Sequence, residues 1–306
     1  MIEHVPVLLE EVVSQIEAGG PPAFIVDATL GLGGYSERFL NQWESCRVLG
    51  IDQDAMALEQ SQKRLSEASR QGRFVACESN FRRIGAVLEE IGWGKPDAVV
   101  FDLGVSNLQL SIAERGFSFQ EDGPLDMRMG VEGQTAANLL NTLSLDDLRR
   151  LIRDFGEEPY AGQIAKGIVA YRQRKGPIET TGELVEVIRK TLPSPLQRKM
   201  NRHPARRTFQ ALRIAVNDEI GALREGLEEA SGSVDHKGCI IVISYHSLED
   251  RIVKHSFNDW EKSGMGRRFP RKAIMPSDEE VQRNYKSRSA MLRVFRMAGS
   301  AIRKGR

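Results

Sequence analysis

The sequence Asp27-Ala28-Thr29-Leu30-Gly31-Leu32-Gly33-Gly34-Tyr35-Ser36 lies between two short apolar runs, Phe24-Ile25-Val26 and Arg47-Val48-Leu49-Gly50-Ile51. Each run predicts a buried strand, and the segment from Ser36 to Trp43 predicts a helix between them. Asp52 follows the second strand directly. Strand, glycine loop, helix, strand and terminal acid is the order of a nucleotide-binding βαβ unit, in which the acid accepts hydrogen bonds from ribose hydroxyls. We therefore predict a nucleoside site at this loop.

The charge of the loop bears on which nucleoside it takes. Its glycine spacing is not GxGxxG, and Asp27 closes the first predicted strand. An acid there would repel a pyrophosphate and attract a cation. S-adenosylmethionine carries a ribose, an ammonium and a sulfonium but no phosphate. The sequence therefore favours a methyl donor and disfavours a NAD-dependent dehydrogenase.

The alternation of strands and helices continues beyond Asp52. Helices are predicted over 54–66, with Asp54 as N-cap, and over 81–91, and strands over 73–77 and 97–101, the last followed by Asp102. Such alternation is typical of a parallel, doubly wound Rossmann-like α/β sheet. A further strand over 239–245, a helix opened by a capping box at Ser247 and a final edge strand over 290–296 would complete it.

A different pattern interrupts the sheet. Residues 104–133 have the composition of a loop, and helices follow over 144–155, 160–174 and 181–191 without strands between them. A long helix over 206–230 would lead back to the sheet. We therefore expect two domains: a sheet domain of residues 1–105 and 206–306, and an inserted all-helical domain of residues 106–205.

Composition narrows the class of protein. The 306 residues are 41% hydrophobic and 28% charged, as in an ordinary globular protein. We expect Cys46, Cys77 and Cys239 to be reduced core thiols without metal-ligand spacing, and the protein to be cytoplasmic, bound neither to a membrane nor to a metal.

Basic residues are concentrated in two acid-free stretches. Residues 187–217 hold eight Lys or Arg residues and residues 262–276 hold five, although the formal net charge of the chain is only +1. Most charged runs are solvated surface, but two such runs in a nearly neutral protein favour a phosphate-rich partner.

Several motifs in order along the chain resemble those of the bacterial 16S rRNA (cytosine-N4)-methyltransferases. The resemblance includes the glycine loop and extends from the N-terminus to the C-terminal segment. The other motifs are His4-Val5-Pro6-Val7-Leu8-Leu9, Phe101-Asp102-Leu103-Gly104-Val105-Ser106, Glu114-Arg115-Gly116-Phe117-Ser118-Phe119, Asp122-Gly123-Pro124-Leu125-Asp126-Met127-Arg128-Met129, residues 203–213, residues 244–251 and residues 287–293.

The resemblance implies a cytoplasmic class I methyltransferase that uses S-adenosylmethionine. Its substrate would be a cytidine in the decoding centre of 16S rRNA within the small ribosomal subunit. The family's donor-site positions correspond here to Gly33, Gly34, Tyr35, Asp52, Phe81, Asp102 and Gln109.

Two departures from the family pattern affect different parts of the predicted site. The family usually has His in place of Tyr35, which can still contribute its backbone. It usually has Ser-Pro-Gln in place of Asn107-Leu108-Gln109, which makes the positioning of the base less secure.

Transfer to a cytosine amine needs a hydrogen-bond acceptor beside a poor nucleophile. Asp102, at the end of the fourth predicted strand, is our first candidate, and a turn-forming acid is its alternative role. Asn107 could grip the base edge. Tyr245 could stack on the base and His246 could move a proton, with a core aromatic and a strand-end histidine as equally weighted alternatives.

The helical region supplies the predicted contacts with rRNA phosphates, namely Arg202, His203, Arg206, Arg207 and Arg213. Two other functions stay open. One is a non-catalytic RNA-binding factor in assembly of the small subunit, and the other is an amino-methyltransferase acting on another nucleic acid. A DNA enzyme of this kind would more typically have an Asp/Ser/Asn-Pro-Pro-aromatic motif where this chain has Asp102-Leu103-Gly104-Val105.

Overall fold

The computed structural model describes residues 6–200 and 202–299, so His4 and Val5 of the first motif lie outside the described residues. The chain divides into two compact units. One, here called the sheet unit, consists of Met1–Gly104 and Gly221–Arg306; the other, the helical unit, is Val105–Ile220. Each is described by itself below.

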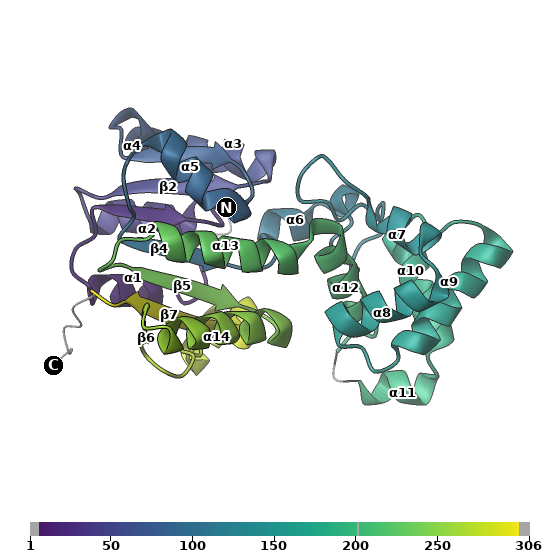
Figure 1. Ribbon diagram of the computed structural model, residues 1–306. Helices are drawn as coiled ribbons and strands as arrows, with labels where there is room; N and C mark the ends of the chain where they lie inside the picture. The colour runs from purple at the N-terminus through teal and green to yellow at the C-terminus, as the bar shows by residue number, and fades with distance from the viewer. Residues whose placement is uncertain (1–5, 201, 300–306) are drawn as a thin grey trace. The chain divides into compact units, whose positions relative to one another are not determined.

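The described part of the sheet unit forms a seven-stranded sheet in the order β3-β2-β1-β4-β5-β7-β6 (Figure 1). Strands β1 to β5 are parallel to one another, whereas β7 is antiparallel to both β5 and β6. This confirms the predicted doubly wound α/β sheet. The strands are β1 (Phe24–Asp27), β2 (Arg47–Asp52), β3 (Phe74–Glu78), β4 (Ala98–Asp102), β5 (Cys239–Ser244), β6 (Gly266–Arg268) and β7 (Met291–Met297).

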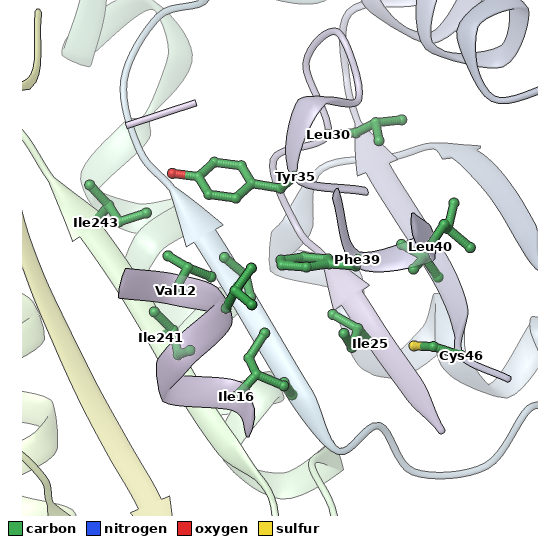
Figure 2. Close-up of a cluster of buried hydrophobic side chains, with 14 of the residues drawn as sticks. Val12, Ile16, Ile25, Leu30, Tyr35, Phe39, Leu40, Cys46, Ile241 and Ile243 are labelled. Atoms are coloured by element: carbon green, nitrogen blue, oxygen red, sulfur yellow. The ribbon is translucent and has the colours of Figure 1, made fainter. Parts of the chain in front are cut away.

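Helices cover both faces of this sheet because successive strand residues point to opposite sides. Ile25 and Ile241 face the helices α1 and α2, with which they form one apolar core (Figure 2). On the other face, Phe101 meets Phe81 edge to face with ring centroids 5.6 Å apart. The helices of this unit are α1 (Leu9–Glu17), α2 (Gly34–Gln42), α3 (Ala55–Arg64), α4 (Ser66–Arg70), α5 (Ile84–Ile91), α13 (Glu219–Ser233), α14 (Ser247–Lys262) and α15 (Asp278–Arg283), with 3₁₀ turns η1 (Phe81–Arg83) and η3 (Tyr285–Ser289).

The helical unit surrounds a separate apolar core, to which Ile164, Leu184 and Leu212 contribute. Its helix α10 begins at a capping box in which the Thr180 hydroxyl accepts from the Glu183 amide at 3.3 Å. The helices are α6 (Asn107–Ser111), α7 (Ala136–Thr142), α8 (Leu145–Gly156), α9 (Ala161–Lys175), α10 (Thr181–Thr191), α11 (Ser194–Lys199) and α12 (Arg206–Asn217), with the 3₁₀ turn η2 (Ala113–Arg115).

Two predicted elements are wrong in detail. The helix over 206–230 is two helices, because the chain breaks at Asp218, which adopts the left-handed conformation with φ 46°. Helix α12 consequently packs within the helical unit, with Leu212 in its core. The strand near 290–296 is not an edge strand, because β6 pairs with its outer side.

Within residues 6–200 and 202–299, no helix has both the length and the apolar composition needed to cross a bilayer. Cys46, Cys77 and Cys239 are free thiols, of which Cys46 and Cys239 are buried and Cys77 is half-buried.

Candidate functional site

Three neighbouring strands of the sheet unit end in an aspartate. Asp52 ends β2, Asp27 ends β1 and Asp102 ends β4, and these strands are adjacent in the order β2-β1-β4. The carboxyl edge of a parallel sheet is where ligands bind in open α/β folds. The three carboxyl groups therefore define the candidate site.

Asp52 is held by backbone amides. Its Oδ2 accepts from the Gly31 amide at 2.8 Å, and its Oδ1 accepts from the Asp54 amide at 2.9 Å. Asp54 in turn caps α3, as predicted, by accepting from the Met56 amide at 3.2 Å. Burial raises the pKa of Asp52 to about 6. The Gln53 amide also donates to this carboxylate, so backbone amides of three residues hold it and about one acceptor position remains for a ribose hydroxyl.

The glycine loop joins this acid to α2. Gly31 (φ 50°) and Gly33 (φ 78°) both adopt positive φ, which side chains disfavour. A Cβ on Gly33 would also lie 3.1 Å from a methyl carbon of Leu65. Gly34 is the first residue of α2, whose N-terminus follows the loop.

Tyr35 does not direct its side chain to the loop. The ring is 4% exposed within the apolar core, and its hydroxyl donates to the Val7 carbonyl (Figure 2). Burial raises its pKa well above the ordinary value. Any part of Tyr35 in donor binding must therefore come from its backbone.

Asp27 differs from the other two acids in being fully buried. It is 0% exposed, and it accepts from the Ser36 hydroxyl at 2.7 Å. Burial raises its pKa to about 6. This burial argues against direct contact between the Asp27 carboxyl group and a cationic ligand.

Asp102 has a phenol as its partner. The Tyr245 hydroxyl donates to Asp102 Oδ1 at 2.6 Å, while the Asp102 amide donates to the Thr29 hydroxyl at 2.6 Å. Burial raises the pKa of Asp102 to about 7; the Tyr245 hydrogen bond opposes this shift, and the charges of Asp27 and Glu249 add to it. A half-buried carboxyl group that titrates near neutrality can take or hold a proton.

Glu249, which the sequence analysis missed, fixes Tyr245. Its Oε2 accepts from the Tyr245 amide at 2.9 Å, and its Oε1 lies 3.1 Å from Nε2 of His246. His246 is the N-cap of α14, so the predicted capping box at Ser247 begins one residue earlier. His246 contacts Glu249 through both its ring and its helix cap, which favours its structural role over proton transfer. The acid at the third helical position was the sequence feature that could have revealed Glu249.

Phe81 lies in η1, half-buried beneath α13. A Cβ on Gly226 of α13 would come within 2.7 Å of the Phe81 ring, so the glycine allows the close approach. The ring is therefore fixed between Phe101 and α13. Its predicted contact with the donor stays a prediction.

Asn107 and Gln109 belong to the helical unit, at the start of α6. The buried Gln109 side chain accepts from the Ser106 amide at 3.0 Å, while the Ser106 hydroxyl accepts from the Gln109 amide at 3.1 Å. This reciprocal cap uses the Gln109 oxygen. Asn107 is half-buried as the first residue of α6. The predicted roles of both residues stay predictions.

The predicted phosphate-binding residues of the helical unit have different environments. Arg213 pairs with Glu219 through two bonds of 2.7 and 2.8 Å, and both side chains are about 15% exposed, which leaves its charge neutralised. Arg202 and Arg207 are exposed, and Arg206 is half-buried. The two exposed arginines are thus the accessible cations of this group.

His203 acts as an aromatic partner within the helical unit. Its ring stacks on Phe119 with centroids 4.6 Å apart and an interplanar angle of 9°. Nε2 lies 2.9 Å from Nη2 of Arg189. Burial and the Arg189 charge lower the pKa of His203. Because the ring stacks on Phe119 and its charged form is disfavoured, it is poorly suited to bind phosphate, and the structure argues against that role.

Comparisons with known proteins agree on one family. The model of the MraW methylase family matches residues 1–298. A protein of Carboxydothermus hydrogenoformans named "Ribosomal RNA small subunit methyltransferase H" is 44% identical over 308 residues, which cover 95% of this chain and 96% of that protein.

Solved structures with similar folds include two described as rRNA methylases. The protein from Clostridium thermocellum is 14% identical with a TM-score of 0.41, and covers 96% of this chain and 99% of its own. That from Streptococcus thermophilus is 11% identical with a TM-score of 0.42, and covers 97% of this chain and 98% of its own. TM-scores at this level are too low to indicate a family, whereas the family match and the 44% identical relative do indicate one.

Proposed function

The chain belongs to the MraW methylase family, and on that premise we propose that it transfers a methyl group from S-adenosylmethionine to the exocyclic N4 amine of a cytidine in the decoding centre of 16S rRNA. The name of the 44% identical relative supports a substrate in small-subunit rRNA. Such a substrate places the enzyme in the cytoplasm.

The carboxyl edge of the sheet fits the donor. After binding the Gly31, Gln53 and Asp54 amides, the Asp52 carboxylate keeps about one acceptor position, which suits a hydrogen bond from a ribose hydroxyl. Gly31 and Gly33 adopt positive φ, which a side chain would disfavour, so glycine is needed for the tight loop beside Asp52 where the donor would bind. When bound, S-adenosylmethionine supplies an electrophilic methyl carbon on a sulfonium.

The single observation that carries the proposal is the Asp102–Tyr245 pair. Asp102 Oδ1 is occupied by the phenol at 2.6 Å, whereas Oδ2 has no hydrogen bond to any described residue. Oδ2 can accept from the cytosine amine, which turns the nitrogen lone pair toward the methyl carbon. After transfer, the nitrogen carries a positive charge and an extra proton. A carboxylate with a pKa of about 7 can take that proton.

The proposed function is tested with labelled S-adenosylmethionine and small ribosomal subunits from cells that lack this modification. We expect label in 16S rRNA, and nucleoside mapping should place it on N4 of one cytidine. Label on another base or another nucleic acid would contradict the proposal. Tight binding to the subunit without transfer would favour the non-catalytic assembly factor.

We further propose that Arg202 and Arg207 bind rRNA phosphates. Both are exposed within a stretch that lacks acids. For RNA binding, replacing both by Ala should reduce the slope of log K against log salt concentration by up to about 1.8. Each lost phosphate contact reduces that slope by about 0.7–0.9. S-adenosylmethionine affinity should not change. A matched control replaces Lys166 and Arg174, two exposed cations of α9. An equal change in that control would show a general charge effect.

A further inference from the structure

The C-terminal part of the sheet unit contains a third acid-free basic stretch. From Val281 onward the sequence has no Asp or Glu. Two of its arginines serve the fold: Arg293 pairs with Asp250 at 2.7 Å, and Arg296 is buried with a bond of 2.6 Å to the Gln15 carbonyl. Other cations of the stretch lie in and beside η3.

Tyr285, the first residue of η3, is an exposed aromatic residue. It is 68% exposed, so its ring contributes little to the core. The Arg288 guanidinium lies 4.1 Å from the ring centroid, and Arg288 Nη1 donates to the Tyr285 carbonyl at 3.0 Å. The arginine therefore covers one face of the ring and fixes it, while the high exposure leaves the other face open to solvent.

Sheet register places this pair at the same edge as Asp102. Within the sheet, Asp102 of β4 is opposite Ile243 of β5, and Ile243 is opposite Leu292 of β7. The residues of η3 end at Ser289, just before β7 begins at Met291. The chain therefore passes from η3 into β7 beside the carboxyl end of β5.

We infer that Tyr285 and Arg288 form a stacking subsite for an unpaired nucleotide of the RNA substrate that flanks the methylated base. This inference rests on the proposed function. A base stacks on the open face of Tyr285, because every base has a π-face and single-stranded RNA is commonly bound on aromatic side chains. The exposed Lys286 next to Tyr285 and the charge of Arg288 attract the phosphates on either side.

Four variants test the subsite in methyl transfer to small ribosomal subunits that lack the modification. Tyr285→Ala should raise KM for the subunit by about 5- to 150-fold, the usual range for one lost base stack. Tyr285→Phe should keep the wild-type KM, because the ring remains. Arg288→Ala should raise KM by less than Tyr285→Ala. Lys237→Ala, which removes an exposed cation before the amino end of β5, should change nothing. S-adenosylmethionine affinity should be constant throughout.

A KM for Tyr285→Ala within twofold of the wild type would overturn the subsite, as would an equal loss in Lys237→Ala. A second measurement is independent of catalysis: binding of a single-stranded RNA of about ten nucleotides, within the roughly 4–16 nucleotides that one single-strand-binding fold covers. Tyr285→Ala should weaken it and Tyr285→Phe should not. If the wild type transfers no methyl group to the subunit, the proposed function fails, and this binding measurement alone decides the subsite.

Discussion

Asp52 and Asp102 occupy equivalent places in the sheet but have different partners. Each ends a parallel strand beside β1, and burial raises the pKa of each to about 6 and about 7 respectively. The backbone amides of Gly31, Gln53 and Asp54 hold Asp52, whereas the Tyr245 phenol holds Asp102. Backbone amides are permanent donors that fix a carboxylate for binding. A phenol leaves one oxygen available, so Asp102 is the group suited to chemistry.

Asp27 ends the strand between them and shows that a position at this edge does not by itself determine the function of an acid. It has a similarly raised pKa, but it is 0% exposed and bonds to Ser36. A raised pKa at this edge therefore does not by itself identify a functional acid. Access to a ligand and the nature of the partner distinguish the three carboxyl groups.

Asp102→Asn should have the largest effect. The amide keeps the size of the side chain but cannot take the proton of the amine, and loss of a positioned acid or base costs about 10²–10⁴-fold in rate. Single-turnover transfer to small subunits measures the loss, with S-adenosylmethionine affinity as the control. If Asp102→Asn transfers the methyl group at the wild-type rate, Asp102 is only a turn residue, and its role does not contrast with that of Asp52.

Asp52→Ala should act on donor binding. Losing hydrogen bonds between a charged acceptor and the ribose should weaken S-adenosylmethionine binding by about 1.5–3 kcal/mol. Calorimetry measures the affinity, and the rate at saturating donor should change much less than in Asp102→Asn. Asp52→Asn is the milder comparison, because its remaining oxygen still accepts one amide. Unchanged affinity in both variants would contradict a ribose site at Asp52.

Asp27→Asn should change stability more than activity, because it leaves Asp102 and Tyr245 in place and removes only a like charge that raises the pKa of Asp102. An unfolded aspartate titrates near 3.8 and the folded one near 6, so the folded state holds the proton between these values. Stability from this group is therefore lost as pH rises from about 4 to about 6. At pH 8 the variant should be more stable by up to about 2 kcal/mol, since one pKa unit corresponds to about 1.4 kcal/mol and the amide must still be desolvated.

Urea unfolding at pH 5 and pH 8 measures the Asp27→Asn effect. The wild type should lose more stability than the variant between the two pH values. Equal losses would show that the Asp27 carboxyl group is not the source of this pH dependence.

Tyr245→Phe should give the smallest effect, a shift of the pH profile. The phenol stabilises the ionised form of Asp102, so removing it raises the pKa of Asp102 further above its ordinary value. Transfer that needs ionised Asp102 should then rise with pH at a midpoint higher by about 0.5–1 unit, as expected for one hydrogen bond of about 1 kcal/mol. Single-turnover rates across pH 5.5–9 measure the midpoint. An unmoved midpoint would mean that Tyr245 does not set the protonation of Asp102.

The parts of this site that are local in sequence could be predicted. The βαβ order placed Asp52 and Asp102 at strand ends, and the N-cap at Asp54 was confirmed. Apolar runs, glycines and caps act within a few residues, so their pattern is visible in the sequence.

Contacts between distant residues could not be predicted. The Tyr245–Asp102 bond joins residues 143 positions apart. Arg213 was assigned to RNA because its partner, Glu219, lies just beyond the acid-free stretch. Asp27 was assigned to the ligand because strand-end position does not reveal burial. In each case the tertiary partner determined the role.

The discontinuous sheet unit has a consequence for synthesis of the protein. Strands β1 to β4 precede the helical unit, and β5, which pairs with β4, follows it. At roughly 5–20 residues per second, a ribosome needs about 7–30 s to add the residues between Asp102 and Tyr245. During that interval β4 is an unpaired edge that can pair with another nascent chain. A nascent chain that contains β1 to β4 but not β5 therefore exposes a strand edge that favours aggregation. This exposure ends when β5 pairs with β4.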